Sequence, residues 1–551
     1  MCMSRFYAFV LCCHLCIVNA VAQVIEKHRV WSDVPAYTLL FENQEQGVVA
    51  SKPIKSWTEG EGRNYLIGYC DSITKGKFPN PIRLWEAEGY PIGNGRLAAS
   101  VFHGDERDRY SLNEVSFWSG GRNTGTINNK GDKGYDVSGP DVTDKGFGSY
   151  QPVGDLIVDY NALVQSDFVR QITLDKGLVE SSALRQGNMI RSLAFCSYSN
   201  QVMVIRYESQ KRRKLDLRFS FAIQRKEDVI SVGNKGLSLC SRLKNGVECQ
   251  TEVKVLHEGG ELVADKEGLQ LKNADNCTLL VFIATNYEMN AVQKFRGIPA
   301  EERLKQQMAK TAALPYAKLL KNHLSDYQSL YQRQELNIAH TADSLDTLPT
   351  ARRLEAYRKS HTDNGLEELV FRFGRYLMIQ TSRPGSLPAG LQGIWNGMVA
   401  APWGNDYHSN INFQMVYWLP EVGNLSECHL PMLDYLKAMR MPFQENTREY
   451  LKAIGESTDE IENNEGWIVY TSHNPFGAGG WQVNLPGAAW YGLHLWEHYA
   501  FTNDTIYLRQ HAYPMMKELC HYWQKHLKAL GEGGEGFVLI IYLLILANIL
   551  N

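Results

Sequence analysis

The first half of the chain consists of short apolar runs separated by turn residues. β-branched and aromatic side chains gather between clusters of glycine, asparagine and aspartate, as in 201–207, 215–222 and 279–284. Segment 229–271 continues the pattern, with turns expected at Gly233-Asn234, Asn245-Gly246 and Gly259-Gly260. Many short strands with turn signals between them predict an all-β sandwich domain over residues 27–290. The glycine-rich segment 121–148 has little hydrophobic pattern, and we expect a long loop there.

Near residue 300 the pattern takes the period of a helix. Residues 300–336 are charged, with leucines on one side, and we interpret 291–350 as a helical linker. Apolar stripes then predict further helices through 351–536: one over 364–378 with Asn364 as its N-cap, one opening at Ser426, one over 447–454 stopped by Gly455, one over 488–499, and one between Pro514 and Gly531. The order is typical of an (α/α)6 toroid of helix pairs. Roughly seven helices are too few for six pairs, so this domain is expected to be a partial toroid.

Both ends of the chain differ from the globular part. Residues 1–22 have the features of a secretory signal: Arg5, an apolar run over 6–18, and the small-x-small site Ala20-Val21-Ala22. We therefore expect an exported protein, periplasmic or secreted. The apolar run is too short to span a bilayer, so no membrane span is expected in the mature chain.

Residues 537–551 form an apolar tail without a charged side chain. It is also short for a membrane span, which needs about 20 residues. We interpret it as the aberrant product of a frameshift or a misjudged gene end, with a hydrophobic membrane tail as the alternative.

Composition excludes several classes of function. The formal net charge is −3 and no basic block is present, so nucleic acid is not an expected partner. Seven cysteines outside the first 22 residues are widely scattered, which is neither a disulfide framework nor zinc-ligand spacing. Most are expected to be buried thiols, and neither a metal nor another cofactor is expected.

The stretch 406–418, DYHSNINFQMVYW, combines amides, aromatics, a histidine and a carboxylate. Asn410 and Asn412 are two residues apart, so their side chains share one side only if the backbone is extended there. Amides cannot ionise near neutral pH, but they can hold a water or a substrate hydroxyl beside a carboxylate. The alternative is that these asparagines cap the following helix. His408 and Asp406 likewise have structural alternatives, a satisfied buried histidine and a local ion pair or turn cap.

Several motifs, taken together, resemble glycoside hydrolase family 95, the inverting α-L-fucosidases. They follow one another in the order PIGNGRL (91–97), LNE (112–114), FWSG (117–120), YQPVGDL (150–156), GRYL (374–377), SRPG (382–385), LQGIWN (391–396), the stretch 406–418, and AWYGLHLWEHY (489–499). The resemblance covers most of residues 30–530 and implies a β-sandwich, a helical linker and an (α/α)6 catalytic barrel. It also implies hydrolysis of terminal α-linked L-fucose in glycans, with L-galactose as a related substrate.

The resemblance further implies that Asn410 and Asn412 activate the attacking water while a glutamic acid protonates the leaving oxygen. His408 and Asp406 would line the sugar site. Trp403, Trp395 and Trp490 are possible sugar contacts, and we retain Trp403 and Trp395 as candidates. His473 is a candidate contact at the rim of the site. In the family the acid and an aspartate lie further along, where this chain has its apolar tail. We therefore expect half of an active site and impaired activity. The alternatives are a non-catalytic carbohydrate-binding remnant or unstable fragment, and a phosphorylase of related architecture.

Overall fold

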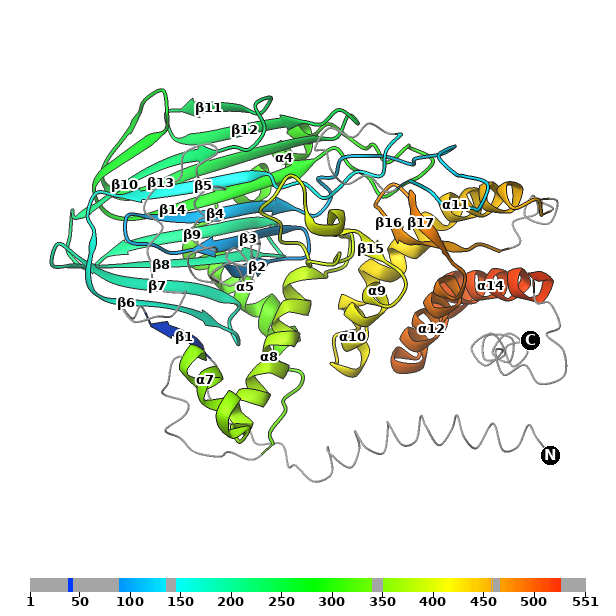
Figure 1. The fold of residues 1–551 in the computed structure, drawn as a ribbon. Coiled ribbons are helices and arrows are strands. Elements are labelled where there is room, and N and C mark those ends of the chain that lie inside the picture. Colours follow the sequence, from blue (N-terminus) through cyan, green and yellow to red (C-terminus); the bar gives the residue numbers. More distant parts are fainter. Residues whose placement is uncertain are drawn as a thin grey trace.

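The computed structural model describes residues 38–42, 89–134, 145–338, 350–456, 458 and 466–526. The expected signal peptide (1–22) and the apolar tail (537–551) lie outside these residues. A large sheet fills one half of the molecule and helices fill the other, with α8, α9 and α10 between them (Figure 1).

The strands of the large sheet form one antiparallel system. Its order is β1-β6-β7-β8-β9-β14-β10-β5-β4-β3-β2, with β11, β12 and β13 joined to β14. The strands are β1 (Thr38–Glu42), β2 (Tyr90–Gly93), β3 (Leu97–Phe102), β4 (Arg107–Glu114), β5 (Gly154–Tyr160), β6 (Val164–Thr173), β7 (Leu178–Arg185), β8 (Asn188–Ser197), β9 (Val202–Ser209), β10 (Leu215–Ala222), β11 (Val229–Gly233), β12 (Gly236–Arg242), β13 (Glu248–Ala264) and β14 (Leu269–Thr285).

The sheet curls because β14 is long enough to belong to two layers. Residues 276–281 of β14 pair with β9, whereas residues 269–274 pair with β10. The far edge then folds back, so that β2 and β3 contact β7, β8 and β9. The predicted β-rich domain is therefore present as one large curled antiparallel sheet.

One predicted turn is wrong. Gly259 and Gly260 lie inside β13, at a bulge where the pairing register with β14 shifts after Glu258. Both have positive φ, 68° and 69°, and a Cβ on Gly260 would lie 2.2 Å from the Lys272 carbonyl oxygen. A glycine pair suits a bulge as well as a turn, since both need this backbone conformation.

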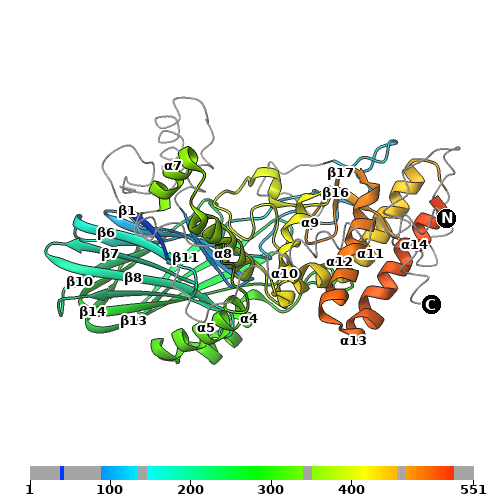
Figure 2. The same ribbon diagram turned by 90° about the horizontal axis from the view of Figure 1, so that it is seen from below.

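The first two helices after the large sheet, α4 and α5, pack against it. α4 packs on β13 and β14, and α5 packs on β8 and α8 (Figure 2). The helices are α4 (Ala300–Thr311), α5 (Tyr316–Tyr331), α7 (Thr350–Ser360), α8 (Asn364–Thr381), α9 (Asn412–Val416), α10 (Leu419–Val422), α11 (Leu430–Ala453), α12 (Leu485–Thr502), α13 (Thr505–Tyr507) and α14 (Tyr513–His526), with 3-10 turns η2 (Pro402–Asn405) and η3 (Ser426–Cys428) and a π turn η4 (Leu508–Ala512). A small second sheet of β15 (Tyr407–His408), β16 (Val469–His473) and β17 (Gly479–Asn484) lies among them.

Two helix predictions need correction. The N-cap of α8 is Asp363, whose carboxylate accepts a hydrogen bond from the Leu366 amide, and Asn364 is already helical. The helix predicted over 447–454 is the end of α11, which runs through Pro442 without a break. Proline usually ends a helix, but here its ring is buried and packs beside Gly477, so tertiary contact outweighs the local penalty.

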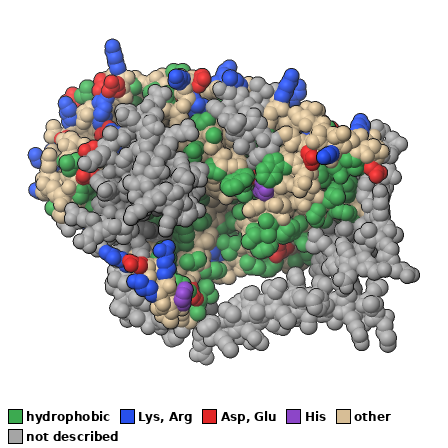
Figure 3. Space-filling model, viewed as in Figure 1, with side chains coloured by type: hydrophobic (Ala, Val, Ile, Leu, Met, Phe, Trp, Pro, Cys, Tyr) green, Lys and Arg blue, Asp and Glu red, His purple; other side chains and the backbone are tan. Residues whose placement is uncertain are grey.

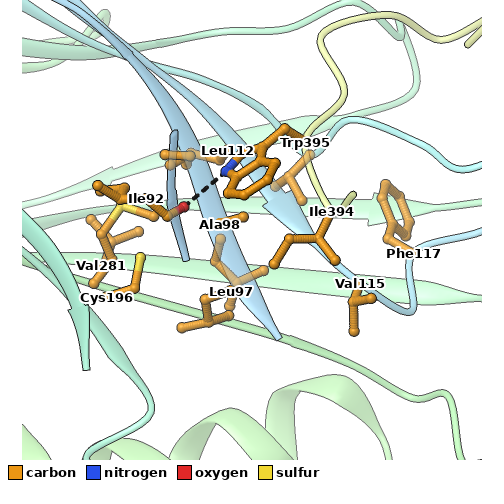
Figure 4. Close-up of a cluster of buried hydrophobic side chains, with 14 of the residues drawn as sticks. Ile92, Leu97, Ala98, Leu112, Val115, Phe117, Cys196, Val281, Ile394 and Trp395 are labelled. Carbon is orange, nitrogen blue, oxygen red and sulfur yellow. Dashed lines mark hydrogen bonds between the residues drawn. The ribbon is translucent and has the colours of Figure 1, made fainter. Parts of the chain in front are cut away.

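The sheet and the helices share one hydrophobic core. Ile92 and Leu97 of the sheet belong to the same buried cluster as Ile394 and Trp395 of the loop after α8 (Figure 4). The motif PIGNGRL lies at this junction, where the Gly93 amide donates to the Gln380 side chain of α8. A Cβ on Gly93 would lie 2.5 Å from the Gln380 carbonyl oxygen, so glycine permits the close approach.

The expectation of mostly buried thiols is confirmed for the cysteines that the structure describes. Among the cysteines in the described ranges, Cys240 is exposed and the other five are buried, and none of them forms a disulfide. No helix within those ranges has the length and apolar character needed to cross a membrane.

Candidate active site

The stretch that carries the candidate amides is anchored by the small sheet. β15 pairs with β16, and Ser409 immediately after it is held by backbone and side chain. The Ser409 amide donates to the Thr471 carbonyl (2.7 Å), its hydroxyl donates to the Tyr470 carbonyl (2.7 Å), and its own carbonyl accepts from Asn484 Nδ2 (2.9 Å). The backbone that precedes Asn410 is therefore fixed at three points.

Asn410 and Asn412 both lie at the surface. Asn410 is in the turn after β15, and Asn412 is the first residue of α9. The N-cap of α9 is Ile411, and no side chain caps this helix. The capping alternative therefore fails, and neither amide is hydrogen-bonded to any residue in the part of the chain described. Both are free to bind a ligand.

Three apolar side chains that lie close to the two amides in the sequence are exposed. Ile411, Met415 and Trp418 are 41%, 47% and 46% exposed, and hydrophobic side chains gather over the helical half of the surface in Figure 3. Polar groups set in an apolar surface suit a ligand that has both hydroxyls and apolar faces, such as a sugar.

Asp406 and His408 form a buried pair just before the asparagines. His408 Nδ1 lies 3.0 Å from Asp406 Oδ2, and the Asp406 side chain is fully buried. If Nδ1 carries the proton that the carboxylate accepts, Nε2 keeps its lone pair. No residue in the described ranges hydrogen-bonds Nε2, so this nitrogen can accept a hydrogen bond from a substrate hydroxyl.

Trp481 of β17 faces this histidine. Its ring lies edge-on to His408, with centroids 5.5 Å apart and planes at 89°, and 42% of the residue is exposed. Trp403, in η2, is 58% exposed with φ of 49°. Sequence reasoning proposed Trp403 and missed Trp481, because only the pairing of β15 and β17 with the central strand β16 brings Trp481 close to His408.

His473 lies beneath the site and not at its rim. It is 1% exposed, and both ring nitrogens are 2.8 Å from a tyrosine hydroxyl, Nδ1 from Tyr435 and Nε2 from Tyr491. Burial lowers the pKa of His473 to about 3, with a smaller contribution from His408. The structure thus corrects the expectation of a rim contact, because no ring nitrogen is left for a sugar.

Trp395 also lies apart from the amides. It is 8% exposed, and its indole Nε1–H donates to the Ile92 carbonyl oxygen at 3.0 Å within the core (Figure 4). Its neighbour Asn396 exchanges hydrogen bonds with Asn113, a residue of the LNE motif. Several motifs therefore encode the junction between the sheet and the helices, and Trp395 serves packing there.

A second polar cluster joins α10, α11 and α12. Glu421 Oε1 accepts from His429 Nδ1 (2.8 Å) and His498 Nδ1 (2.6 Å), and His429 Nε2 lies 3.1 Å from His494 Nδ1. Ser426 donates to the other carboxylate oxygen at 2.5 Å. Burial alone would raise the pKa of Glu421, but the hydrogen bonds from the two histidines outweigh it and lower the pKa to about 2. We call Glu421, His429 and His498 the helix junction.

The helix junction has donor types that bind metals, since one carboxylate and two imidazoles are a common zinc set. Its distances are those of hydrogen bonds. Two ligands of a tetrahedral zinc ion lie about 3.3 Å apart, so the junction would have to open to admit an ion. Sequence reasoning missed the junction, although His494 and His498 are four residues apart and share one face of a helix.

No general acid emerges beside the asparagines from the carboxylates that the structure describes nearby. Asp406 pairs with His408, and Glu421 is taken up by the helix junction. Burial, with the charge of Glu421, raises the pKa of Glu497 to about 7, which would suit an acid. Glu497 is nevertheless thirteen residues along α12 from Asn484, whose side chain donates to the Ser409 carbonyl next to Asn410. About 20 Å of helix, at 1.5 Å per residue, separates Glu497 from that contact.

Comparisons with known families match both halves of the chain. Residues 315–538 match the glycosyl hydrolase family 95 catalytic domain. Residues 77–137 and 127–290 match the glycosyl hydrolase family 65 N-terminal domain.

Two curated relatives are fucosidases by name. "Probable alpha-fucosidase A" of Aspergillus niger is 28% identical over 477 residues, which are 80% of this chain and 59% of the relative. "Alpha-L-fucosidase 2" of Arabidopsis thaliana is 26% identical over 513 residues, 84% of this chain and 59% of the relative. The chain thus spans 59% of the length of these relatives. Among solved structures, "Putative kojibiose phosphorylase from human microbiome" aligns with a TM-score of 0.49 and 11% identity, over 78% of this chain and 56% of that one.

Proposed function

We propose that the protein acts on terminal α-linked L-fucose in oligosaccharides, since residues 315–538 match the glycosyl hydrolase family 95 catalytic domain. The observation that carries the proposal is the exposed pair Asn410 and Asn412, set on an anchored backbone beside the buried Asp406–His408 pair. The names of the relatives support fucose as the sugar.

We propose that the reaction inverts the anomeric carbon. Asn410 and Asn412 hold the attacking water, which donates one hydrogen bond to an amide oxygen and gives its other proton to a carboxylate as its oxygen bonds to the anomeric carbon. The bond from that carbon to the leaving oxygen breaks, and a glutamic acid protonates the leaving oxygen; the described residues near the amides supply neither carboxylate. An inverting site keeps acid and base about 6.5–9.5 Å apart so that this water fits between them. His408 Nε2 accepts from a sugar hydroxyl, and Asp406 holds the histidine in the tautomer that leaves Nε2 free.

The described carboxylates near the amides are engaged elsewhere, so the catalytic acid is not assigned. We therefore propose that the 551-residue chain binds L-fucose but turns over substrate more slowly than a complete hydrolase.

The test is release of L-fucose from an α1,2-linked fucoside by the purified chain, followed by proton NMR. Inversion predicts that β-L-fucose appears first. Asn410→Ala and Asn412→Ala should each lower the rate by about 10²-fold or more, because water activation is lost. Asn161→Ala, at an exposed site in the sheet domain, is the matched control and should leave the rate unchanged.

Other outcomes separate the alternatives. L-fucose binding without any turnover would favour a carbohydrate-binding protein. Release that depends on inorganic phosphate would favour a phosphorylase. α-L-fucose as the first product would refute the inverting mechanism.

Export remains a proposal based on residues 1–22. Expression with the native N-terminus, followed by mass spectrometry of the mature protein, should find a chain that begins near Gln23.

A further inference from the structure

The glycine-rich loop after β4 crosses from the sheet domain to the small sheet of the candidate site. Asn123 and Gly479 exchange two hydrogen bonds, from Asn123 Nδ2 to the Gly479 carbonyl (2.6 Å) and from the Gly479 amide to Asn123 Oδ1 (3.2 Å). Asn474 Nδ2 donates to the carbonyls of Gly121 (3.0 Å) and Phe147 (2.7 Å). The loop that lacked a hydrophobic pattern in the sequence is thus fixed by polar contacts to β16, β17 and the turn between them.

Lys133 attaches the same loop through both its backbone and its side chain. Its backbone amide donates to the Trp481 carbonyl (2.8 Å), and the Trp481 amide donates to the Lys133 carbonyl (3.2 Å). Its ammonium group is fully buried, 2.8 Å from Glu449 and 2.9 Å from Asn446 on α11. A buried lysine is costly unless it is paired, and here both partners lie on one helix. Lys133 therefore ties the loop, α11 and β17 together.

Trp481 needs such support. Its φ of 65° places the backbone in the left-handed region, which is strained for a residue with a large side chain. The pairing with Lys133 satisfies both backbone groups of Trp481 in this conformation. The same conformation directs the indole ring to His408, 5.5 Å away.

We propose that Lys133 is a positioning residue for the sugar site: it holds Trp481 against His408, so a loop of the sheet domain fixes the position of one wall of a site on the helical domain. The inference rests on the proposed function for its ligand, a fucose residue placed against the Trp481 ring and His408 Nε2. The placement of Trp481 itself does not depend on that function.

The first experiment follows Trp481 without a substrate. The full chain is labelled with 5-fluorotryptophan, and the Trp481 resonance is assigned in the ¹⁹F NMR spectrum by its loss in Trp481→Phe. Lys133→Met should shift or broaden this resonance. Lys130→Met, an exposed lysine of the same loop, is the matched control and should leave it in place.

The second experiment measures binding of L-fucose by calorimetry. Lys133→Met should weaken binding about tenfold. Trp481→Ala should weaken it by a similar factor, and the double variant should be no weaker than Trp481→Ala alone, because Lys133 acts through the indole. Lys133→Arg, which keeps the charge, should restore most of the affinity.

The outcomes are distinct. The proposal would be overturned if the Trp481 resonance does not move in folded Lys133→Met. It would also be overturned if the loss of affinity in the double variant equals the product of the losses in the two single variants. Should Lys133→Met not fold, Glu449→Gln replaces it: the ion pair is weakened while an oxygen remains, and a smaller shift of the same resonance is expected. Absence of fucose binding by the wild-type chain, with the Trp481 resonance still sensitive to Lys133, would refute the proposed function and leave the positioning role intact.

Discussion

The helix junction offers a direct test of how three helices are held together. Glu421 receives two imidazole donors on one oxygen and the Ser426 hydroxyl on the other, and its side chain is 1% exposed. No lysine or arginine in the described part of the chain forms an ion pair with it. Glu421→Ala would leave two buried imidazole N–H groups without an acceptor. We expect this variant to lose about 4 kcal/mol of the free energy of unfolding.

Glu421→Gln separates charge from shape. The amide oxygen can still accept from both histidines, and the amide nitrogen can face the Ser426 oxygen. Two charge-assisted hydrogen bonds become neutral ones, which costs roughly 2 kcal/mol, while the cost of burying a charge disappears. We therefore expect a net loss of about 1 kcal/mol in urea unfolding at pH 7.

The stabilisation that the Glu421 carboxylate provides should depend on pH. The pKa of Glu421 lies at about 2 in the folded chain, below its ordinary 4.5, so its contribution is present above pH 4.5. It is lost as the pH falls from about 4.5 towards 2. The difference between wild type and Glu421→Gln should stay constant from pH 7 to 5 and shrink below that.

Glu427→Gln is the matched control, because Glu427 pairs with Arg333 at 2.8 Å with both side chains partly exposed. Its cost should be below about 0.5 kcal/mol. A Glu421→Gln variant as stable as wild type at pH 7 would refute the reasoning, since the buried charge would then add nothing to the junction.

Three further predictions use other parts of the structure. Dialysis against EDTA should change the melting temperature by less than about 1 °C, and a loss restored by Zn²⁺ would show instead that the helix junction binds metal. Burial lowers the pKa values of His473 to about 3 and of His103 and His323 to about 4, so these residues stay neutral when folded and gain protons on unfolding. The free energy of unfolding should therefore fall below pH 6.5, by up to about 4 kcal/mol per pH unit near pH 5. Urea unfolding at several pH values measures this slope. Trp395→Phe should lower the free energy of unfolding by about 1–2 kcal/mol and leave the Kd for L-fucose unchanged. A higher Kd would show instead that Trp395 contributes to sugar binding.

Local sequence patterns predicted most elements of secondary structure. The strands around 202–209, 215–222 and 269–285 and the helix over 364–381 follow from their apolar periods. The failures occur where glycine or proline has two meanings. Gly259-Gly260 makes a bulge instead of a turn, and Pro442 continues a helix instead of ending it. In both cases a distant part of the chain decides between conformations that are locally similar in energy.

The candidate site divides in the same way. From the spacing of Asn410 and Asn412 we expected a loop or strand that leads into a helix if both amides serve one site. The structure has Asn410 in the turn after β15 and Asn412 as the first residue of α9. Asp406 and His408 were also predicted, because they lie in the same short stretch. Trp395 and His473 were assigned to the sugar from residue type alone, and residue type does not report burial.

What the sequence alone determined is therefore local: the β-rich and helical halves, and the amides, histidine and carboxylate that share thirteen residues. Tertiary structure decided everything that depends on contact across the chain. It turned Trp395 and His473 into buried supports, joined Glu421 to two histidines from other helices, and brought Lys133 from the sheet domain to Trp481 beside His408. Periodicity encodes which face of an element is buried, but only the packing of elements determines which side chains meet.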